Sequence, residues 1–102
     1  MNLLLLGRGK TGSLVAEVAA ERKHVLVIAG AKENIACDAL APENLRGIDA
    51  VIDFTAPHAV VAHIEACLRA GKNMVVGTTG WYKELDRIRK LVEEHGTGFV
   101  YA

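Results

Sequence analysis

Short apolar runs alternate along the chain with stretches of helical periodicity. The first run, Leu3 to Leu6, is continuous and ends at Gly7, which is typical of a strand buried on both faces of a parallel sheet. From Thr11 to Arg22 the apolar residues recur at helical spacing, which predicts a helix with one apolar face. That face is formed by Leu14, Val15, Val18 and Ala19.

The same alternation continues to the last residue. The stretch from Gly30 to Gly47 lacks a period, and we expect a loop with at most a short helical turn near Pro42 to Leu45. Strands are predicted at residues 3–6, 25–29, 49–54, 74–76 and 98–102, and helices at residues 11–22, 57–70 and 81–94.

Apolar strands that alternate with helices predict an α/β protein with a parallel sheet. Right-handed crossovers then give a Rossmann-like, doubly wound sheet of about five strands with helices on both faces. We interpret residues 1–102 as one domain. In such sheets ligands bind beyond the carboxyl ends of the strands, where this sequence places its glycines and threonines.

The first strand ends in a glycine-rich loop, GRGKTG, that fits the dinucleotide pattern G-x-G-x-x-G. Gly7 permits the sharp turn, Gly9 lets a pyrophosphate approach the backbone, and Gly12 lets the helix pack close to the sheet. The helix N-terminus offers free N–H groups to the anion, and neighbouring basic side chains add charge. The candidate pyrophosphate-binding residues are Gly7, Arg8, Gly9, Lys10, Thr11 and Gly12.

A second interpretation of the same loop is a P-loop that ends in Gly9-Lys10-Thr11. The P-loop pattern would then place its first glycine at Leu4, in the middle of the strand. Only two residues would remain to wrap a phosphate, so the dinucleotide interpretation is favoured.

The end of the second strand bears on the choice between NAD and NADP. An NAD site usually has an acidic residue there, which accepts a hydrogen bond from the ribose 2′-hydroxyl. Here the strand ends at Gly30, Lys32 follows closely, and Glu33 lies late. Lys32 is either a cation for a 2′-phosphate or a solvated loop charge. We expect a preference for NADPH, or acceptance of both cofactors.

Composition narrows the class of protein. Twelve basic and twelve acidic residues give a formal net charge of zero, which argues against a nucleic-acid binder. No stretch is long enough to span a membrane.

Cys37 and Cys67 form no metal or redox motif, so we expect reduced thiols in a cytoplasmic protein with no metal site. None of the four histidines has a carboxylate partner at motif spacing, and we expect surface or packing roles for them.

Two further turns follow neighbouring strands. The segments Asp53-Phe54-Thr55-Ala56-Pro57 and Gly77-Thr78-Thr79-Gly80 would open on the same crevice as the glycine loop. The second turn combines backbone N–H groups with two hydroxyls and no charge, which suits a neutral carboxamide or a carboxylate approached by dipoles. Ordinary helix capping by Thr79 would explain one threonine but not the whole turn.

Together these motifs resemble dihydrodipicolinate reductase of bacterial lysine biosynthesis. A glycine-rich loop on the first strand, then D-F-T-x-P, a helix and V-[VI]-G-T-T-G occur in the family's order, and the resemblance covers essentially the whole chain. It implies that Phe54 and Thr55 border the dinucleotide and that the nicotinamide carboxamide lies on Gly77, Thr78 and Thr79. Thr79 would also face the substrate, and Ala102 would begin an Asn-Phe-Ser segment that continues the cofactor site.

The same resemblance implies a second domain that binds the dicarboxylate substrate, donates a proton and builds the tetramer. That domain is absent from these 102 residues, so we expect the chain to contain no catalytic residue and to be inactive alone, although a homo-oligomer is possible. An alternative is a stand-alone module that binds NAD(P) and regulates without catalysis. A protein like homoserine dehydrogenase is a third possibility, against which the pairing of DFTAP with GTTG argues.

Overall fold

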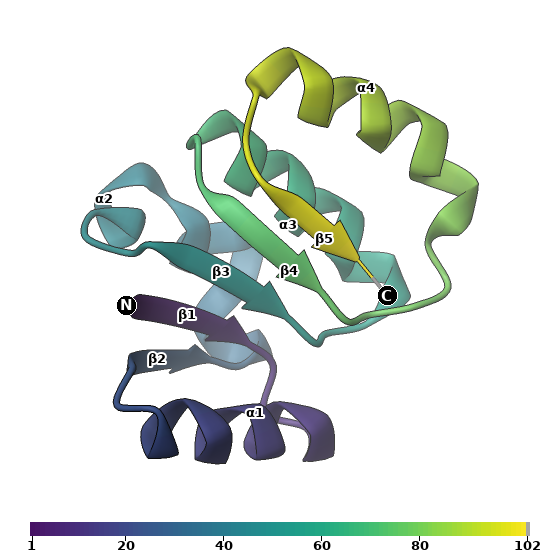
Figure 1. Ribbon diagram of the computed structural model, residues 1–102. Coiled ribbons are helices and arrows are strands. Elements are labelled where there is room, and N and C mark those ends of the chain that lie inside the picture. Colours follow the sequence, from purple (N-terminus) through teal and green to yellow (C-terminus); the bar gives the residue numbers. More distant parts are fainter. Residues whose placement is uncertain (102) are drawn as a thin grey trace.

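The computed structural model describes residues 1–101, apart from the side chains at positions 31, 33 and 35. Its five strands form one parallel sheet in the order β2-β1-β3-β4-β5, and Figure 1 shows them all pointing toward the same edge. The predicted α/β, Rossmann-like sheet is therefore confirmed. The elements are β1 (Asn2–Leu6), α1 (Lys10–Glu21), β2 (Val25–Ala29), η1 (Ala31–Leu40), α2 (Pro42–Leu45), β3 (Ala50–Asp53), α3 (Pro57–Arg69), β4 (Asn73–Val76), η2 (Tyr82–Glu84), α4 (Leu85–His95) and β5 (Phe99–Tyr101).

The segment between β2 and β3 differs from the predicted loop. Residues 31–40 form 3-10 turns, and the left-handed residues Ala36 and Cys37 (φ 53° and 62°) keep them from becoming a regular helix. Leu40 is buried in the core and Cys37 packs against it. Packing against distant elements, which local periodicity does not report, therefore orders this segment.

The last helix starts later than its sequence pattern predicts. Trp81 precedes η2, and α4 begins only at Leu85. Trp81 is nonetheless buried, because its ring packs against aromatic side chains of β5 and its indole N–H donates to the carbonyl oxygen of Thr78 (2.7 Å). The predicted helix thus included Trp81, a buried core residue that lies before the helix and not in it.

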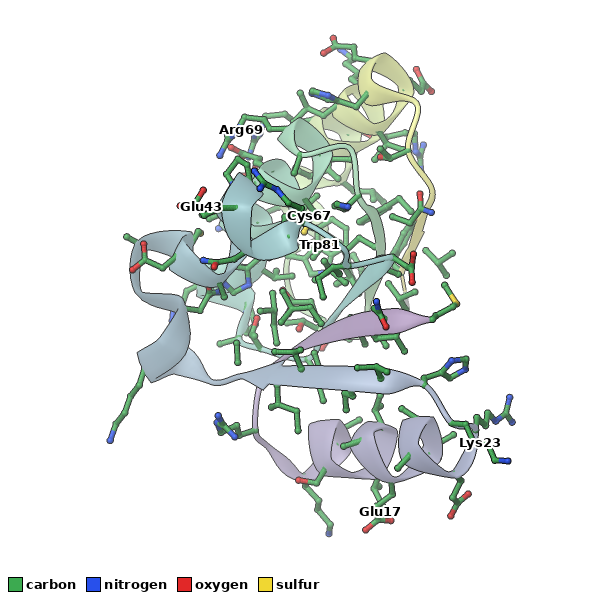
Figure 2. The ribbon with its side chains drawn as sticks, turned by 90° about the vertical axis from the view of Figure 1, so that its left-hand side faces the viewer. Glu17, Lys23, Glu43, Cys67, Arg69 and Trp81 are labelled. Atoms are coloured by element: carbon green, nitrogen blue, oxygen red, sulfur yellow. The ribbon has the colours of Figure 1, made fainter. Side chains whose placement is uncertain are left out.

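The two faces of the sheet are covered unequally. Helices α3 and α4, together with η1, lie on one face and enclose the main core, whereas α1 alone lies on the other (Figures 1 and 2). Figure 2 shows Cys67 and Trp81 inside the thicker layer, while Glu17 and Lys23 point outward around α1. No helix in the described part of the chain is long and apolar enough to cross a bilayer.

The apolar face of α1 is only partly buried. Ala19 is 5% exposed, but Leu14 and Val18 are 56% and 47% exposed and line an apolar groove against the sheet. Beyond α1, Val75 and Val100 stand in register on neighbouring strands and are also exposed. The pattern predicted an apolar helix face correctly, but the sheet covers only part of it.

Candidate dinucleotide site

The glycine loop leaves β1 through a residue that has to be glycine. Gly7 has a φ of 112°, in the region that side chains disfavour, and its N–H donates to the carbonyl oxygen of Ala29 (2.9 Å). A Cβ on Gly7 would also collide with the carbonyl oxygen of Phe54. The turn therefore holds the ends of β1, β2 and β3 close together.

Helix α1 presents its N-terminus to this turn without a competing group. The helix starts at Lys10 with no side-chain cap and no acidic residue in its first turn, and the N–H of Ser13 makes the first bond, to the carbonyl oxygen of Gly9 (3.0 Å). A Cβ on Gly9 would enter open space. These features fit a pyrophosphate, which binds to free N–H groups at a helix N-terminus.

Two neighbouring cavities open at the carboxyl edge of the sheet, with volumes of about 380 and 320 Å³. Both are within the usual range of ligand pockets, and both are lined by Phe54 and Thr55. The first, here called the β2 cavity, includes Gly7, Arg8, Ala29, Gly30, Asn34 and His63. The second, here called the threonine cavity, includes Gly9, Lys10, Thr11, Gly12, Gly77, Thr78 and Thr79.

Phe54 joins the turns after β3 and β4. Its ring lies so close over Gly77 that a Cβ there would overlap the ring atoms. Glycine at this position therefore lets the aromatic ring rest on the backbone between the two cavities.

Asp53, at the end of β3, holds the same two turns together through hydrogen bonds. Its carboxylate is fully buried, and Oδ1 accepts from the Thr55 N–H (2.9 Å), the Thr55 hydroxyl (2.6 Å) and the Thr78 hydroxyl (3.1 Å). The Thr55 N–H also donates to Thr78 Oγ1 (2.8 Å). Thr78 is 6% exposed, and its hydroxyl is held by these hydrogen bonds while the residue lines the threonine cavity.

His63 is buried, which agrees with the packing role that the sequence predicts, but it also has a carboxylate partner that the sequence analysis missed. Its Nδ1 lies 2.7 Å from Asp53 Oδ2, and its Nε2 lies 3.1 Å from Asn34 Nδ2. The partners are 10 and 29 positions away along the chain, so no motif spacing reveals them. A signal was available, because helical periodicity turns this residue of α3 toward the sheet.

The end of β2 has a cation where NAD enzymes usually have an acid. A Cβ on Gly30 would lie 2.8 Å from Arg8 Nε and 3.0 Å from its Cδ, so the Arg8 side chain lies across the strand end. Lys32, in contrast, is exposed on η1 and is not among the described residues that line the two cavities.

The structure therefore brings most of the predicted cofactor residues to one edge of the sheet. Thr79 is exposed and lines the threonine cavity. Ala102 lies outside the described residues. The residues that the sequence predicts and the two cavities contain are Gly7, Arg8, Gly9, Lys10, Thr11, Gly12, Phe54, Thr55, Gly77, Thr78 and Thr79.

Known proteins are similar to this chain in sequence and in fold. The family model for the N-terminus of dihydrodipicolinate reductase matches residues 1–102. A 4-hydroxy-tetrahydrodipicolinate reductase from Christiangramia forsetii is 31% identical over 104 residues, which cover 100% of this chain and 41% of the relative. The enzyme of the same name from Natronomonas pharaonis is 38% identical over 88 residues, which cover 79% of this chain and 36% of the relative.

Solved structures show the same architecture. A dipicolinate-bound dihydrodipicolinate reductase from Paenisporosarcina sp. matches with a TM-score of 0.76 and 24% identity, over 100% of this chain and 46% of that one. A Synechocystis biliverdin reductase, solved with biliverdin and NADP+, matches with a TM-score of 0.78 and 25% identity, over 98% of this chain and 37% of that one. The chain thus spans less than half the length of these relatives, and it belongs to the family of the N-terminal, NAD(P)-binding domain of dihydrodipicolinate reductase, an oxidoreductase.

Proposed function

We propose that NAD(P)H lies across the two cavities, with its adenosine end in the β2 cavity and its nicotinamide end in the threonine cavity. The observation that carries this proposal is that both cavities share Phe54 and Thr55 and meet at the uncapped N-terminus of α1. The pyrophosphate then lies on the loop from Gly7 to Gly12, where no described side chain caps the helix N–H groups.

The threonine cavity orients the nicotinamide ring, which supplies a hydride when the cofactor is bound. In this proposal the backbones of Gly77 and Thr78 hold the carboxamide, because the Thr78 hydroxyl is occupied by Asp53. Thr79 is free to face both the cofactor and a substrate, since it is exposed at the rim. Phe54 excludes water from one side of the ring.

The chain prefers NADPH in this proposal. Arg8 lies over Gly30, where an acid would bind the 2′-hydroxyl of NADH, and a guanidinium binds a phosphate with paired hydrogen bonds. Lys32 acts at most as a more distant charge, because it is exposed outside the cavities. A higher affinity for NADH than for NADPH would contradict this part of the proposal.

Binding can be measured directly on the 102-residue chain. Trp81 donates a hydrogen bond to the threonine turn, so its fluorescence reports titration with NADPH or NADH. Gly9→Asp places a negative charge in the pyrophosphate position, and we expect it to weaken binding of both cofactors by about tenfold or more. Ala20→Asp makes the same charge change at the far end of α1, where the residue is exposed, and should leave binding unchanged. Equal affinities for the two variants would refute the assigned cavity.

In the longer relatives' context, we propose that the domain presents the cofactor for hydride transfer to the cyclic dipicolinate precursor in lysine and diaminopimelate biosynthesis. The proposal is supported by the family match and by the shared name of the curated relatives. Hydride transfer requires both reactants in one geometry, and a second domain has to supply the dicarboxylate site and the proton. We therefore expect the chain alone to bind cofactor without turnover. Cofactor-dependent reduction of the cyclic substrate by the purified chain would refute this expectation.

A stand-alone regulatory module remains the second candidate, because the two cavities can bind a dinucleotide without any catalytic residue. The two candidates differ in what the gene encodes after residue 102. A continuing reading frame with an Asn-Phe-Ser segment and a His- and Lys-containing motif supports the enzyme, and a stop codon supports the module.

We also propose a cytoplasmic location, supported by the two free thiols.

We further propose self-association through the sheet face that α1 covers only in part. This proposal is supported by exposed apolar side chains on α1 and on the sheet, namely Leu14, Val18, Val75 and Val100. Sedimentation of the chain at increasing concentration tests it, and a monomer at all concentrations would contradict it.

A further inference from the structure

A chain of hydrogen bonds at the wall of the β2 cavity links three elements that are distant in sequence. Asp53 at the end of β3 contacts His63 of α3, and His63 contacts Asn34 of η1. The amide of Asn34 is fixed in turn, because its Oδ1 accepts from the backbone N–H of Ala39 (3.0 Å). All three side chains are buried or half-buried.

The direction of each hydrogen bond follows from the backbone. A peptide N–H only donates, so Ala39 requires the oxygen of the Asn34 amide, and the NH₂ group has to face His63. That NH₂ group only donates, so Nε2 of His63 accepts. The ring proton is then on Nδ1 and is donated to the Asp53 carboxylate. The network therefore selects neutral His63 in its Nδ1–H form.

One donor is left over in this arrangement. The Asn34 NH₂ group has two hydrogens, and one of them is used by His63. The second has no partner among the described residues, and Asn34 lines the β2 cavity together with Arg8 and Gly30. Asn34 thus presents a hydrogen-bond donor at the strand end where an NADH site usually has an acceptor.

We propose that Asn34 is a specificity-determining residue that binds the 2′-phosphate of NADPH, and that His63 and Asp53 are positioning residues that hold its amide in the donor orientation. This inference rests on the proposed binding of NAD(P)H in the β2 cavity. It assigns part of the preference to an uncharged side chain, whose orientation is set by the adjoining His63 and Asp53.

The main test compares dissociation constants of NADPH and NADH, measured by calorimetry, for the wild-type chain and Asn34→Asp. The new carboxylate repels the 2′-phosphate and accepts from the 2′-hydroxyl, so we expect the preference for NADPH to fall by about tenfold or more. Asn34 is only half-buried, so the variant retains the fold, which circular dichroism verifies. An unchanged ratio of the two constants would overturn the proposal.

The positioning role has its own variants and a spectroscopic readout. His63→Leu releases the Asn34 amide and should weaken NADPH binding several-fold more than NADH binding. His63→Gln keeps one donor and one acceptor and should restore the ratio. In the wild-type chain, long-range ¹H–¹⁵N spectra should show His63 protonated at Nδ1 and bare at Nε2. The opposite tautomer, or equal losses for both cofactors in His63→Leu, would overturn the positioning role.

Failure of the inference is distinguishable from failure of the proposed function. If the wild-type chain binds neither cofactor, the proposed function fails. If the wild-type chain binds both while Asn34→Asp leaves their ratio unchanged, only the inference fails.

Discussion

Replacing Asp53 with Asn is expected to destabilise the domain because it puts a donor in place of an acceptor in a buried chain of hydrogen bonds. The new amide oxygen can still accept from Thr55 and Thr78, whose three donors converge on the present Oδ1. The new NH₂ group takes the place of Oδ2 and faces His63. His63 then has an NH₂ donor on each side, since Asn34 lies against its other nitrogen.

The magnitude follows from the number of donors left unpaired. Either neutral form of His63 can accept from only one neighbour, so one buried donor–donor contact remains in both forms. An unsatisfied buried polar group costs about 1–3 kcal/mol. Domains of this kind are stable by about 5–15 kcal/mol, so Asp53→Asn should still fold.

A second substitution should remove the conflict. Asn34→Asp supplies an acceptor on the far side of His63 and still accepts from the Ala39 N–H. In the double variant the bonds run in the opposite direction, from position 53 through His63 to position 34, and every donor again has an acceptor. We expect Asn34→Asp to recover most of the about 1–3 kcal/mol that Asp53→Asn loses.

Urea unfolding at pH 7, followed by Trp81 fluorescence, measures the free energy of unfolding for the four proteins of this cycle. Asp86→Asn makes the same chemical change at an exposed position of α4 and should cost less than about 1 kcal/mol. If the changes in the free energy of unfolding of the two single variants simply add in the double variant, the assigned direction of the hydrogen bonds is wrong.

Three further predictions concern other parts of the fold. Gly7→Ala should lower the free energy of unfolding by about 2 kcal/mol or more, because of its φ of 112° and a backbone collision. The matched control Gly9→Ala adds a Cβ in open space at the N-cap of α1 and should cost less than about 1 kcal/mol, so similar losses in urea unfolding would contradict the geometry. Burial raises the pKa of the Cys67 thiol to about 12, so at pH 8 iodoacetamide should modify Cys37 first, and mass spectrometry showing rapid labelling of native Cys67 would oppose this. Trp81→Phe removes the indole donor to a buried carbonyl oxygen and should cost about 2 kcal/mol in unfolding followed by circular dichroism; a loss below about 0.5 kcal/mol would count against that bond.

Local sequence signals were sufficient for the frame of the site. The apolar run before Gly7 and the helical periodicity after it placed the glycine loop between a strand and a helix, as the structure has it. The parallel order of strands then placed Phe54 and Thr79 at the same edge, because strands that run the same way end on the same side. These features depend on neighbours in the chain and on rules of strand connection, both of which the sequence carries directly.

Some features depend on which surfaces meet after folding. The periodicity of α1 marks Leu14 as apolar, but its exposure of 56% depends on how far the sheet extends beneath it. The segment around Asn34 has no pattern of its own and is ordered by packing against α3 and the core.

The sequence by itself therefore determined the order of the elements, the parallel sheet and the glycine and threonine turns that line the two cavities. Only the tertiary structure determined that Asp53, His63 and Asn34 form one hydrogen-bonded chain, and that Arg8 rather than Lys32 lies at the end of β2. The physical reason is the separation along the chain of the residues that interact. Periodicity and turn chemistry act over a few residues, whereas donors and acceptors up to 29 positions apart meet only once three elements have packed together.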